Sequence, residues 1–241
     1  MNKLKVIIPA AGSASRLGIP YSKEIMRIEK GKSLIDNVFD LFQDYEREHV
    51  EFVIIINENK TDIVKYLSRY KNKFNISFCF QNPDFKEYTG AIKSASHLFG
   101  DYNVVLLPDS IIKFDGDLLS IITDTLRTNE VTFLYKREES DAMKSTKGAL
   151  LVDLDGKILD YYDKPKDSSK FNSYWCSFAF RGNSFDNFIS FMENSTLRSN
   201  YVNFDIKETP LYMSKGIQVQ DYIDLGTWSE VDKFVKSKAD S

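Results

Sequence analysis

Histidine and cysteine are scarce in this chain, and their scarcity narrows the chemistry that it can perform. The 241 residues include two histidines and two cysteines. Neither His49 nor His97 lies in a motif that would build a histidine-dependent triad or a zinc site. Cys79 and Cys176 each lie within an apolar, strand-like run, so we expect two buried thiols that share neither a disulfide nor a metal ion.

The sequence also lacks a long apolar run and an excess of positive charge. No run approaches the roughly 18 to 20 apolar residues of a membrane span. The net charge of −3, from 32 cations and 35 anions, provides no global field to attract nucleic acid. We therefore expect neither a membrane nor a nucleic-acid partner. Only residues 1–5 precede the first apolar run, too few for a signal peptide, so we expect a cytoplasmic location.

The first half of the chain alternates apolar runs with amphipathic segments at the spacing of βαβ units. We expect strands at about residues 5–9, 52–57, 75–81, 103–108 and 131–136. Most of these runs are continuously apolar, which is typical of strands covered on both faces by helices. One covering helix is expected to follow a cap at Ser33. The pattern predicts an α/β fold with a mainly parallel sheet flanked by helices.

From about residue 140 the pattern changes. Residues 148–162 alternate around Asp155-Gly156, which is typical of a hairpin turn, and a strand is expected at 174–180. No linker or internal repeat interrupts the chain. We therefore predict a single domain over residues 1–241, with one half at about 1–138 and a second half at about 139–241 that contains a smaller antiparallel lobe.

A loop of small residues with two cations follows the first expected strand. It consists of Ala10, Ala11, Gly12, Ser13, Ala14 and Ser15, with Arg16 next and Lys23 seven positions later. Small side chains let backbone N–H groups converge on an anion, at the edge of an open α/β sheet where ligands bind. The loop thus predicts a site for a phosphate chain. An ordinary strand-to-helix turn with solvated cations fits the same residues, so the loop alone leaves both interpretations open.

Two carboxylates stand where they could hold a metal ion. Asp109 directly follows the fourth expected strand, and Asp224 ends a strand-like run ahead of Gly226 and Thr227. Mg²⁺ prefers one or two carboxylates together with phosphate oxygens, which a strand end beside a phosphate loop would supply. A turn-forming aspartate or a strand ahead of a capped helix has the same residue types, so these patterns alone do not decide.

A third acidic motif, Asp115-Gly116-Asp117, has the DxD spacing with which some glycosyltransferases hold their metal. An amphipathic segment follows it at once, so we favour a turn and a helix cap over a metal site.

Taken together, the motifs resemble those of the sugar-1-phosphate nucleotidylyltransferases, in the same order from residue 9 to residue 228. The segments 22–26 and 222–228 are similar to the thymidylyl- and uridylyltransferases. The words Pro-Ala-Ala-Gly and the short step from Arg16 to Lys23 are closer to cytidylyltransferases of isoprenoid and polyol phosphate synthesis. Asp163-Lys164-Pro165 is similar to the Glu-Lys-Pro element of the sugar-phosphate branch, with an aspartate one methylene shorter.

This resemblance implies a Rossmann-like fold whose smaller lobe binds sugar, and transfer of a nucleotidyl group from CTP, UTP or dTTP to a sugar 1-phosphate with Mg²⁺. The residues implied are Arg16, Lys23 and Lys164 for catalysis, residues 10–15 with Gln81 and Gly90 for the nucleotide, Gly148, Asp163 and Lys164 for the acceptor, and Asp109 and Asp224 for the metal. Gly90 is expected to open a helix capped by Thr89.

Several departures from the family pattern keep other functions open. A family glycine is lost at Ala10 or Ala11, and Pro108 and Ser110 flank Asp109. Ser177 stands where thymidylyltransferases have a glycine that contacts sugar. The alternatives are a cytidylyltransferase for a non-sugar phosphate or phosphonate, a protein that binds nucleotide sugars without turnover, and a glycosyltransferase that uses the DxD. The sequence names neither the base nor the sugar, and it is compatible with a homo-oligomer.

Overall fold

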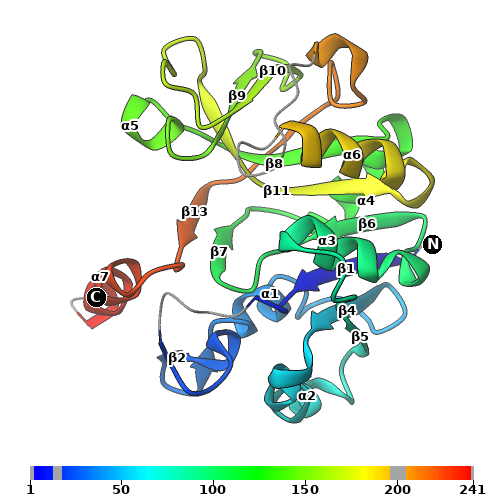
Figure 1. The fold of residues 1–241 in the computed structure, drawn as a ribbon, viewed down its shortest axis with the longest axis vertical. Helices are drawn as coiled ribbons and strands as arrows, with labels where there is room; N and C mark the ends of the chain where they lie inside the picture. Colours follow the sequence, from blue (N-terminus) through cyan, green and yellow to red (C-terminus); the bar gives the residue numbers. More distant parts are fainter. Residues whose placement is uncertain (1–2, 13–17, 196–204, 240–241) are drawn as a thin grey trace.

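The structure is a computed structural model that describes residues 3–12, 18–195 and 205–239 (Figure 1). Its strands are β1 (Leu4–Pro9), β2 (Arg27–Glu29), β3 (Lys32–Ser33), β4 (Val50–Ile56), β5 (Asn75–Phe80), β6 (Tyr102–Val105), β7 (Ser110–Lys113), β8 (Val131–Arg137), β9 (Gly148–Val152), β10 (Ile158–Asp163), β11 (Ser173–Arg181), β12 (Ile217–Gln218) and β13 (Asp221–Asp224). Its α-helices are α1 (Asp36–Asp40), α2 (Thr61–Leu67), α3 (Glu87–Ser94), α4 (Leu118–Thr128), α5 (Asp141–Lys144), α6 (Phe185–Ser195) and α7 (Trp228–Ala239). None of the helices in these ranges is long and apolar enough to cross a membrane.

One large sheet runs through the molecule in the order β10-β9-β11-β6-β1-β4-β5, with β8 and β12 beyond β11. The strands β1, β4, β5 and β6 are parallel, whereas β11 runs antiparallel to β6, β8 and β9. All five strands expected in the first half are present, as are the β9–β10 hairpin and β11. The predicted α/β class is therefore confirmed.

The continuous apolar runs fill two separate cores, one on each face of the sheet. Within β4, Phe52 and Ile54 belong to one core, and Val53 and Ile55 to the other, because successive side chains of a strand alternate between faces. Helices α1, α2 and α4 cover the first face, and α3 and α6 cover the second. This burial on both faces is the physical reason why the runs show no polar alternation.

Strand β11 creates a fork in the sheet. One end of β11 pairs with β9, where Tyr174 lies opposite Ala149, and its other end pairs with β6, where Phe178 lies opposite Val105. The register against β8 shifts between these two stretches, and there the Ser177 hydroxyl donates to the carbonyl of Val105. As a result β6 and the β9–β10 hairpin lie along the same edge of β11, and the sheet opens between them.

A small second sheet brings the end of the chain to this fork. Strand β13 pairs antiparallel with β7, which places Asp224 opposite Ser110, and the Leu225 N–H donates to the Asp109 carbonyl at 2.9 Å. Figure 1 shows β13 descending from the upper lobe to α7 beside β2. Thr227 caps α7, since its hydroxyl accepts from the Glu230 N–H at 3.4 Å and its own N–H donates to the Glu230 carboxylate at 2.9 Å.

The expected cap at Ser33 is wrong. Helix α1 is short, its N-cap is Ile35, and no side chain caps it. Instead, the carboxylate of Asp36 accepts from the Ser33 N–H at 2.8 Å and from the hydroxyls of Tyr66 and Tyr70 at 2.5 and 2.9 Å. Asp36 is thus a buried hydrogen-bond acceptor at the start of α1. Both cysteines are free and buried, as expected.

Candidate active site

The site begins where β1 ends. The Ala10 N–H donates to the Ile55 carbonyl at 2.8 Å, which extends the pairing with β4 by one residue. The Ala11 carbonyl accepts from the Asn57 side-chain amide at 2.6 Å, and Gly12 faces open space. The loop residues Ser13, Ala14, Ser15 and Arg16 lie outside the described residues. The described start of the loop thus lies at the carboxyl edge of the parallel strands, as expected of a phosphate loop.

Lys23 is held at this edge by its two chain neighbours. The Ser22 N–H donates to the Asp62 carboxylate at 2.9 Å, and the Ser22 hydroxyl donates to the same carboxylate. Glu24 accepts from the Lys60 ammonium with both oxygens, at 2.7 and 2.8 Å. Burial raises the pKa of Glu24, and the contact with Lys60 opposes that shift. These anchors fix the backbone on both sides of Lys23, so its side chain enters the interior with little freedom.

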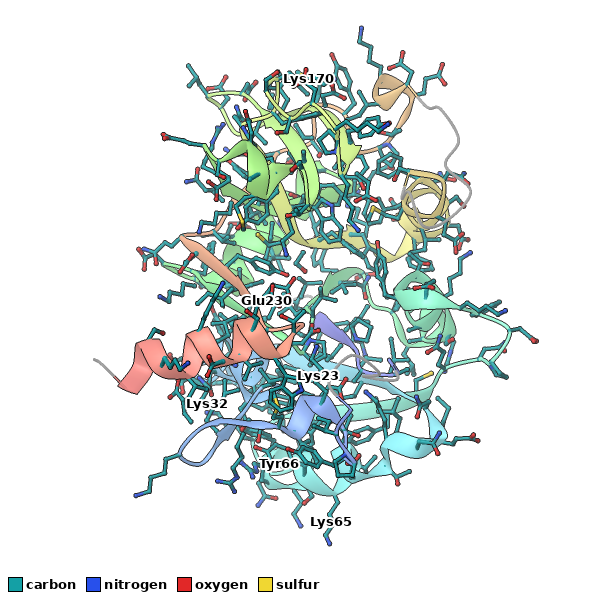
Figure 2. All side chains as sticks on the ribbon, turned by 60° about the vertical axis from the view of Figure 1, so that its left-hand side comes forward. Lys23, Lys32, Lys65, Tyr66, Lys170 and Glu230 are labelled. Carbon is teal, nitrogen blue, oxygen red and sulfur yellow. The ribbon has the colours of Figure 1, made fainter. Side chains whose placement is uncertain are left out.

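The buried side chain of Lys23 ends on Asp109. Its Nζ lies 2.6 Å from Asp109 Oδ2, and the Lys23 side chain is only 8% exposed whereas that of Asp109 is 29% exposed. Figure 2 shows Lys23 near the middle of the molecule, while Lys65 and Lys170 lie at its two ends. The structure therefore brings a predicted catalytic lysine into contact with a predicted metal-binding carboxylate.

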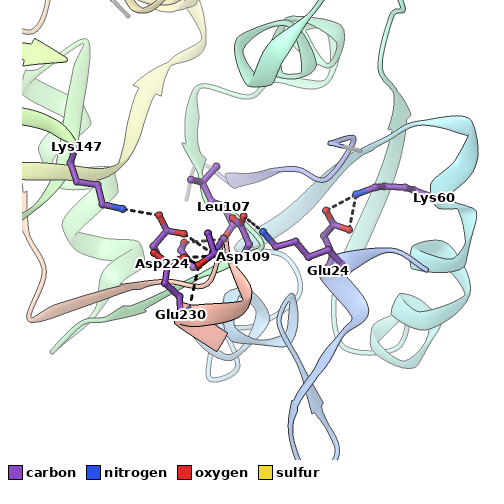
Figure 3. A network of polar contacts seen from close by, with 11 residues as sticks. Glu24, Lys60, Leu107, Asp109, Lys147, Asp224 and Glu230 are labelled. Atoms are coloured by element: carbon purple, nitrogen blue, oxygen red, sulfur yellow. Dashed lines mark hydrogen bonds and ion pairs between the residues drawn. The ribbon is translucent and has the colours of Figure 1, made fainter. Parts of the chain in front are cut away.

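Asp224 also has a lysine partner, and sequence analysis missed it. Lys147 Nζ lies 2.7 Å from Asp224 Oδ2, and the Gly226 N–H donates to Asp224 Oδ1 at 2.9 Å. Figure 3 shows Lys147, Asp224 and Asp109 converging, with the Glu24–Lys60 pair further along the same row. Lys147 directly precedes Gly148, but nothing in the sequence distinguishes it from the other surface lysines.

The donor set at this point fits a magnesium ion. Asp109 and Asp224 offer oxygen ligands from adjacent backbones, and both side chains are about one-third exposed. Mg²⁺ is commonly held by one or two carboxylates, with phosphate oxygens and water completing its octahedron. Burial, and next the nearby Asp224, raise the pKa of Tyr222, so this phenol stays neutral beside the two carboxylates.

Glu46, Glu48 and His49 also cluster within 4.8 Å of one another, on a turn outside this site.

The predicted acceptor residues gather on the other side of the fork. Asp163, at the end of β10, pairs with Gly148 at the start of β9. The next residue, Lys164, has a left-handed backbone with φ of 51°, and its N–H donates to the Lys147 carbonyl at 2.9 Å. Such a conformation is uncommon for a residue with a side chain, and strained residues of this kind cluster at functional sites. The Lys164 ammonium forms no ion pair with any residue that the structure describes.

Gly148 has a packing role that sequence analysis did not anticipate. A Cβ atom at this position would lie 1.8 Å from Trp175 Nε1, so any larger residue would displace the indole ring. The ring stacks on Phe133 with centroids 5.5 Å apart. Whether the Gly148 backbone also approaches a sugar stays a prediction.

Gln81 and Gly90 lie together, but not as expected. The Gln81 side-chain amide donates to the Phe85 carbonyl at 2.6 Å. Gly90 does not open a helix behind a Thr89 cap, because α3 begins at Glu87 and Gly90 lies inside it. A Cβ on Gly90 would lie 2.5 Å from the Phe85 carbonyl carbon, so the glycine lets this loop fold onto the helix. Their contact with a base stays a prediction.

The DxD motif is occupied by structural contacts. The Asp117 carboxylate caps α4 by accepting from the Ser120 N–H at 2.9 Å, and it also accepts from the Tyr45 hydroxyl at 2.6 Å. Burial and then this hydrogen bond raise the pKa of Tyr45 to about 12. Asp115 accepts from the Gln220 amide. The turn and helix cap favoured from the sequence are confirmed.

Solved structures of nucleotidylyltransferases match the chain over nearly its whole length. A UDP-glucose pyrophosphorylase without ligand is 17% identical, with a TM-score of 0.78, over 100% of this chain and 99% of that chain. The enzyme of that name from Acinetobacter baumannii is 15% identical, with a TM-score of 0.70, over 98% and 92%. A protein assigned as a glucose-1-phosphate thymidylyltransferase from Bacillus anthracis is 17% identical, with a TM-score of 0.72, over 99% and 96%.

The sequence itself matches no family model and no curated protein. The structural likeness nevertheless confirms the resemblance at the level of the fold. The chain has the fold of the sugar-1-phosphate nucleotidylyltransferases.

Proposed function

We propose that this protein is a nucleotidylyltransferase that couples a nucleoside triphosphate to a sugar 1-phosphate, giving a nucleotide sugar and pyrophosphate. The observation that carries the proposal is the pair of carboxylates, Asp109 and Asp224, each held by a lysine at the fork of the sheet. Asp109 contacts Lys23, and Asp224 contacts Lys147, whose carbonyl accepts from the Lys164 N–H. Two of the similar UDP-glucose pyrophosphorylase structures contain UDP-glucose and UTP, respectively.

The proposed reaction requires no general base. The phosphate of the acceptor is largely dianionic near pH 7, because its second pKa is about 6. It attacks the α-phosphorus of the triphosphate, forms the new P–O bond in line with the departing pyrophosphate, and needs no proton transfer. Catalysis then consists of positioning and charge neutralisation, which suits a site of lysines, carboxylates and backbone amides without histidine.

Each cation of the site has a proposed task. Lys23 contacts the α-phosphate, since its buried side chain has one fixed direction. Lys164 binds the acceptor phosphate and steers the attacking oxygen. Arg16 binds the β- and γ-phosphates. Asp109 and Asp224 would hold Mg²⁺, which supplies positive charge to the phosphate oxygens of the transition state.

A screen of pyrophosphate release tests this function. CTP, UTP, dTTP, ATP and GTP are each combined with a panel of sugar 1-phosphates and Mg²⁺, with a polyol phosphate and a phosphonate as non-sugar acceptors. We expect release only with an acceptor present, and a nucleotide sugar as the second product. Release with CTP and a non-sugar acceptor alone would establish the cytidylyltransferase alternative. If nucleotide sugars bind but no pair turns over, the protein is a binding protein.

A further inference from the structure

Lys147 stands out because it neutralises a carboxylate that the proposed function needs for a metal ion. Its ammonium lies 2.7 Å from Asp224 Oδ2, and Lys23 makes the corresponding contact with Asp109 at 2.6 Å. The two ammonium groups and the two carboxylates together carry no net charge. A free divalent cation that approaches this point meets no net negative charge, and it would have to displace an ammonium from each carboxylate.

The two lysines are held differently. Lys23 is enclosed, with an 8% exposed side chain, whereas the side chain of Lys147 is 21% exposed. The Lys147 backbone is fixed because its carbonyl accepts from the Lys164 N–H at 2.9 Å, which places both lysines at the rim of the fork. Lys147 Nζ lies 5.6 Å from the centre of the Tyr222 ring. Lys147 can therefore leave Asp224 by rotating its side chain, without any movement of the backbone.

We propose that Lys147 is an internal counter-ion that keeps Asp224 from taking a divalent cation until a nucleotide is bound. The inference rests on the proposed function, because it takes a triphosphate as the ligand that draws Lys147 away. The phosphates of the nucleotide carry more negative charge than the Asp224 carboxylate, so they attract the Lys147 ammonium and free Asp224 for the metal. Lys147 is thus a positioning residue that acts through Asp224 and couples metal binding to nucleotide binding.

The chain provides a closely matched control. Lys136 Nζ lies 2.7 Å from Asp221 Oδ1, at the opposite end of β13, and these side chains are 26% and 33% exposed, compared with 21% and 34% for Lys147 and Asp224. Replacing Lys136 by Met therefore removes the same charge, at a similar exposure, from a carboxylate of the same strand that is not the metal-binding one; Asp221 keeps a longer contact with Lys113, at 3.6 Å.

Binding of Mn²⁺, followed by electron paramagnetic resonance without nucleotide or turnover, tests the proposal. We expect Lys147→Met and Lys147→Gln each to lower the Mn²⁺ dissociation constant by roughly five- to tenfold, because the ammonium that competes with and repels the cation is removed. Lys147→Arg keeps the charge and should match the wild type, as should Lys136→Met. The gain should disappear in the double variant Lys147→Met/Asp224→Asn, because Lys147 acts through Asp224.

Equal Mn²⁺ affinity of the wild type and the neutral Lys147 variants would overturn the proposal. If those variants do not fold, the wild type decides alone, since binding of free Mn²⁺ in the low micromolar range would also overturn it. The metal titration is independent of turnover. If Lys147→Met gains Mn²⁺ affinity while no triphosphate yields pyrophosphate, Lys147 is a counter-ion of Asp224 but its coupling to a nucleotide and the proposed function both fail. If pyrophosphate is released normally but the wild type and Lys147→Met bind Mn²⁺ equally, the proposed function stands and the role of Lys147 fails.

Discussion

Two neighbouring residues, Lys23 and Glu24, form ion pairs of nearly the same length in very different surroundings. Glu24 and Lys60 are closed off from solvent, with side chains 7% and 6% exposed. Lys23 is equally enclosed, but its partner Asp109 is 29% exposed and lies beside Asp224 (Figure 3). Both members of one pair are closed off from solvent, whereas the other pair reaches solvent through Asp109.

The difference separates a scaffold pair from a site pair. A buried ion pair that loses one member leaves an uncompensated charge in a low-dielectric environment, which is costly to stability. A carboxylate that reaches solvent is hydrated when its partner is removed, so the loss falls on whatever ligand the pair serves.

Replacing Asp109 by Asn should have the largest effect on activity. We expect the rate of pyrophosphate release to fall by roughly 10³-fold or more, because the proposed metal site loses one of its carboxylates. The asparagine oxygen can still accept from the enclosed Lys23 but no longer neutralises its charge, so the fold should persist with a smaller free energy of unfolding. Assays with Mg²⁺ and urea unfolding measure the two effects. An active Asp109→Asn variant would disprove the metal assignment.

Replacing Lys60 by Met should have the largest effect on stability, about 3 to 5 kcal/mol in urea unfolding at pH 7. Burial already raises the pKa of Glu24 above 4.5, and loss of Lys60 raises it further. The folded state of the variant then holds a proton that the unfolded state releases. Its stability is retained below pH 4.5 and lost as the pH rises through the raised pKa. A deficit that is the same at pH 5 and pH 8 would contradict this account.

Replacing Lys23 by Met should lower activity more than stability, the opposite of the effect expected for Lys60→Met. We expect kcat/KM to fall by roughly 10²-fold or more, about 2.7 to 4 kcal/mol, as for one preorganised charge contact in a transition state. The stability should change less than in Lys60→Met, because Asp109 is partly hydrated. If Lys23→Met proves as unstable as Lys60→Met and keeps normal kinetics, Lys23 is scaffold as well.

Lys164→Ala extends the comparison to the acceptor side of the fork. The similarity of Asp163-Lys164-Pro165 to the Glu-Lys-Pro element predicts that Lys164 contacts the acceptor phosphate. The KM for the sugar phosphate should rise and transfer should slow, while calorimetric NTP affinity stays within a few-fold of the wild type. Lost NTP affinity with an unchanged acceptor KM would mean that Lys164 belongs to the nucleotide side.

Lys136→Met should have the smallest effect, below about 1 kcal/mol, as for other partly exposed ion pairs. The hydrogen bond from Lys136 lowers the pKa of Asp221 below 3.8. A lowered pKa stabilises the folded state above pH 3.8, and this contribution is lost as the pH falls through the lowered value. The variant should therefore be weaker than the wild type at pH 6 and equal to it at the acid end of a pH series of urea unfolding curves.

The buried sheet could be predicted well from the sequence, because continuous apolar runs such as residues 52–56 are typical of strands covered on both faces. The cap at Thr227 was also predictable, since Glu230 completes a local pattern three residues later. The ion pairs of the candidate site could not be predicted from the sequence. Lys147 lies 77 positions from Asp224, and only the fork in β11 and the return of β13 bring the two together. Gly90 was misplaced because its need for a small side chain comes from a loop folding back, not from a helix start.

Isotope labelling of the acceptor tests the central claim most directly. A sugar 1-phosphate with ¹⁸O at all four phosphate oxygens is turned over with the triphosphate that the screen selects. The masses of the products are then measured by mass spectrometry. Attack of the acceptor phosphate on the α-phosphorus predicts all four labelled oxygens in the nucleotide sugar and an equal amount of unlabelled pyrophosphate. Labelled free phosphate, or pyrophosphate formed without a nucleotide sugar, would contradict the proposed reaction.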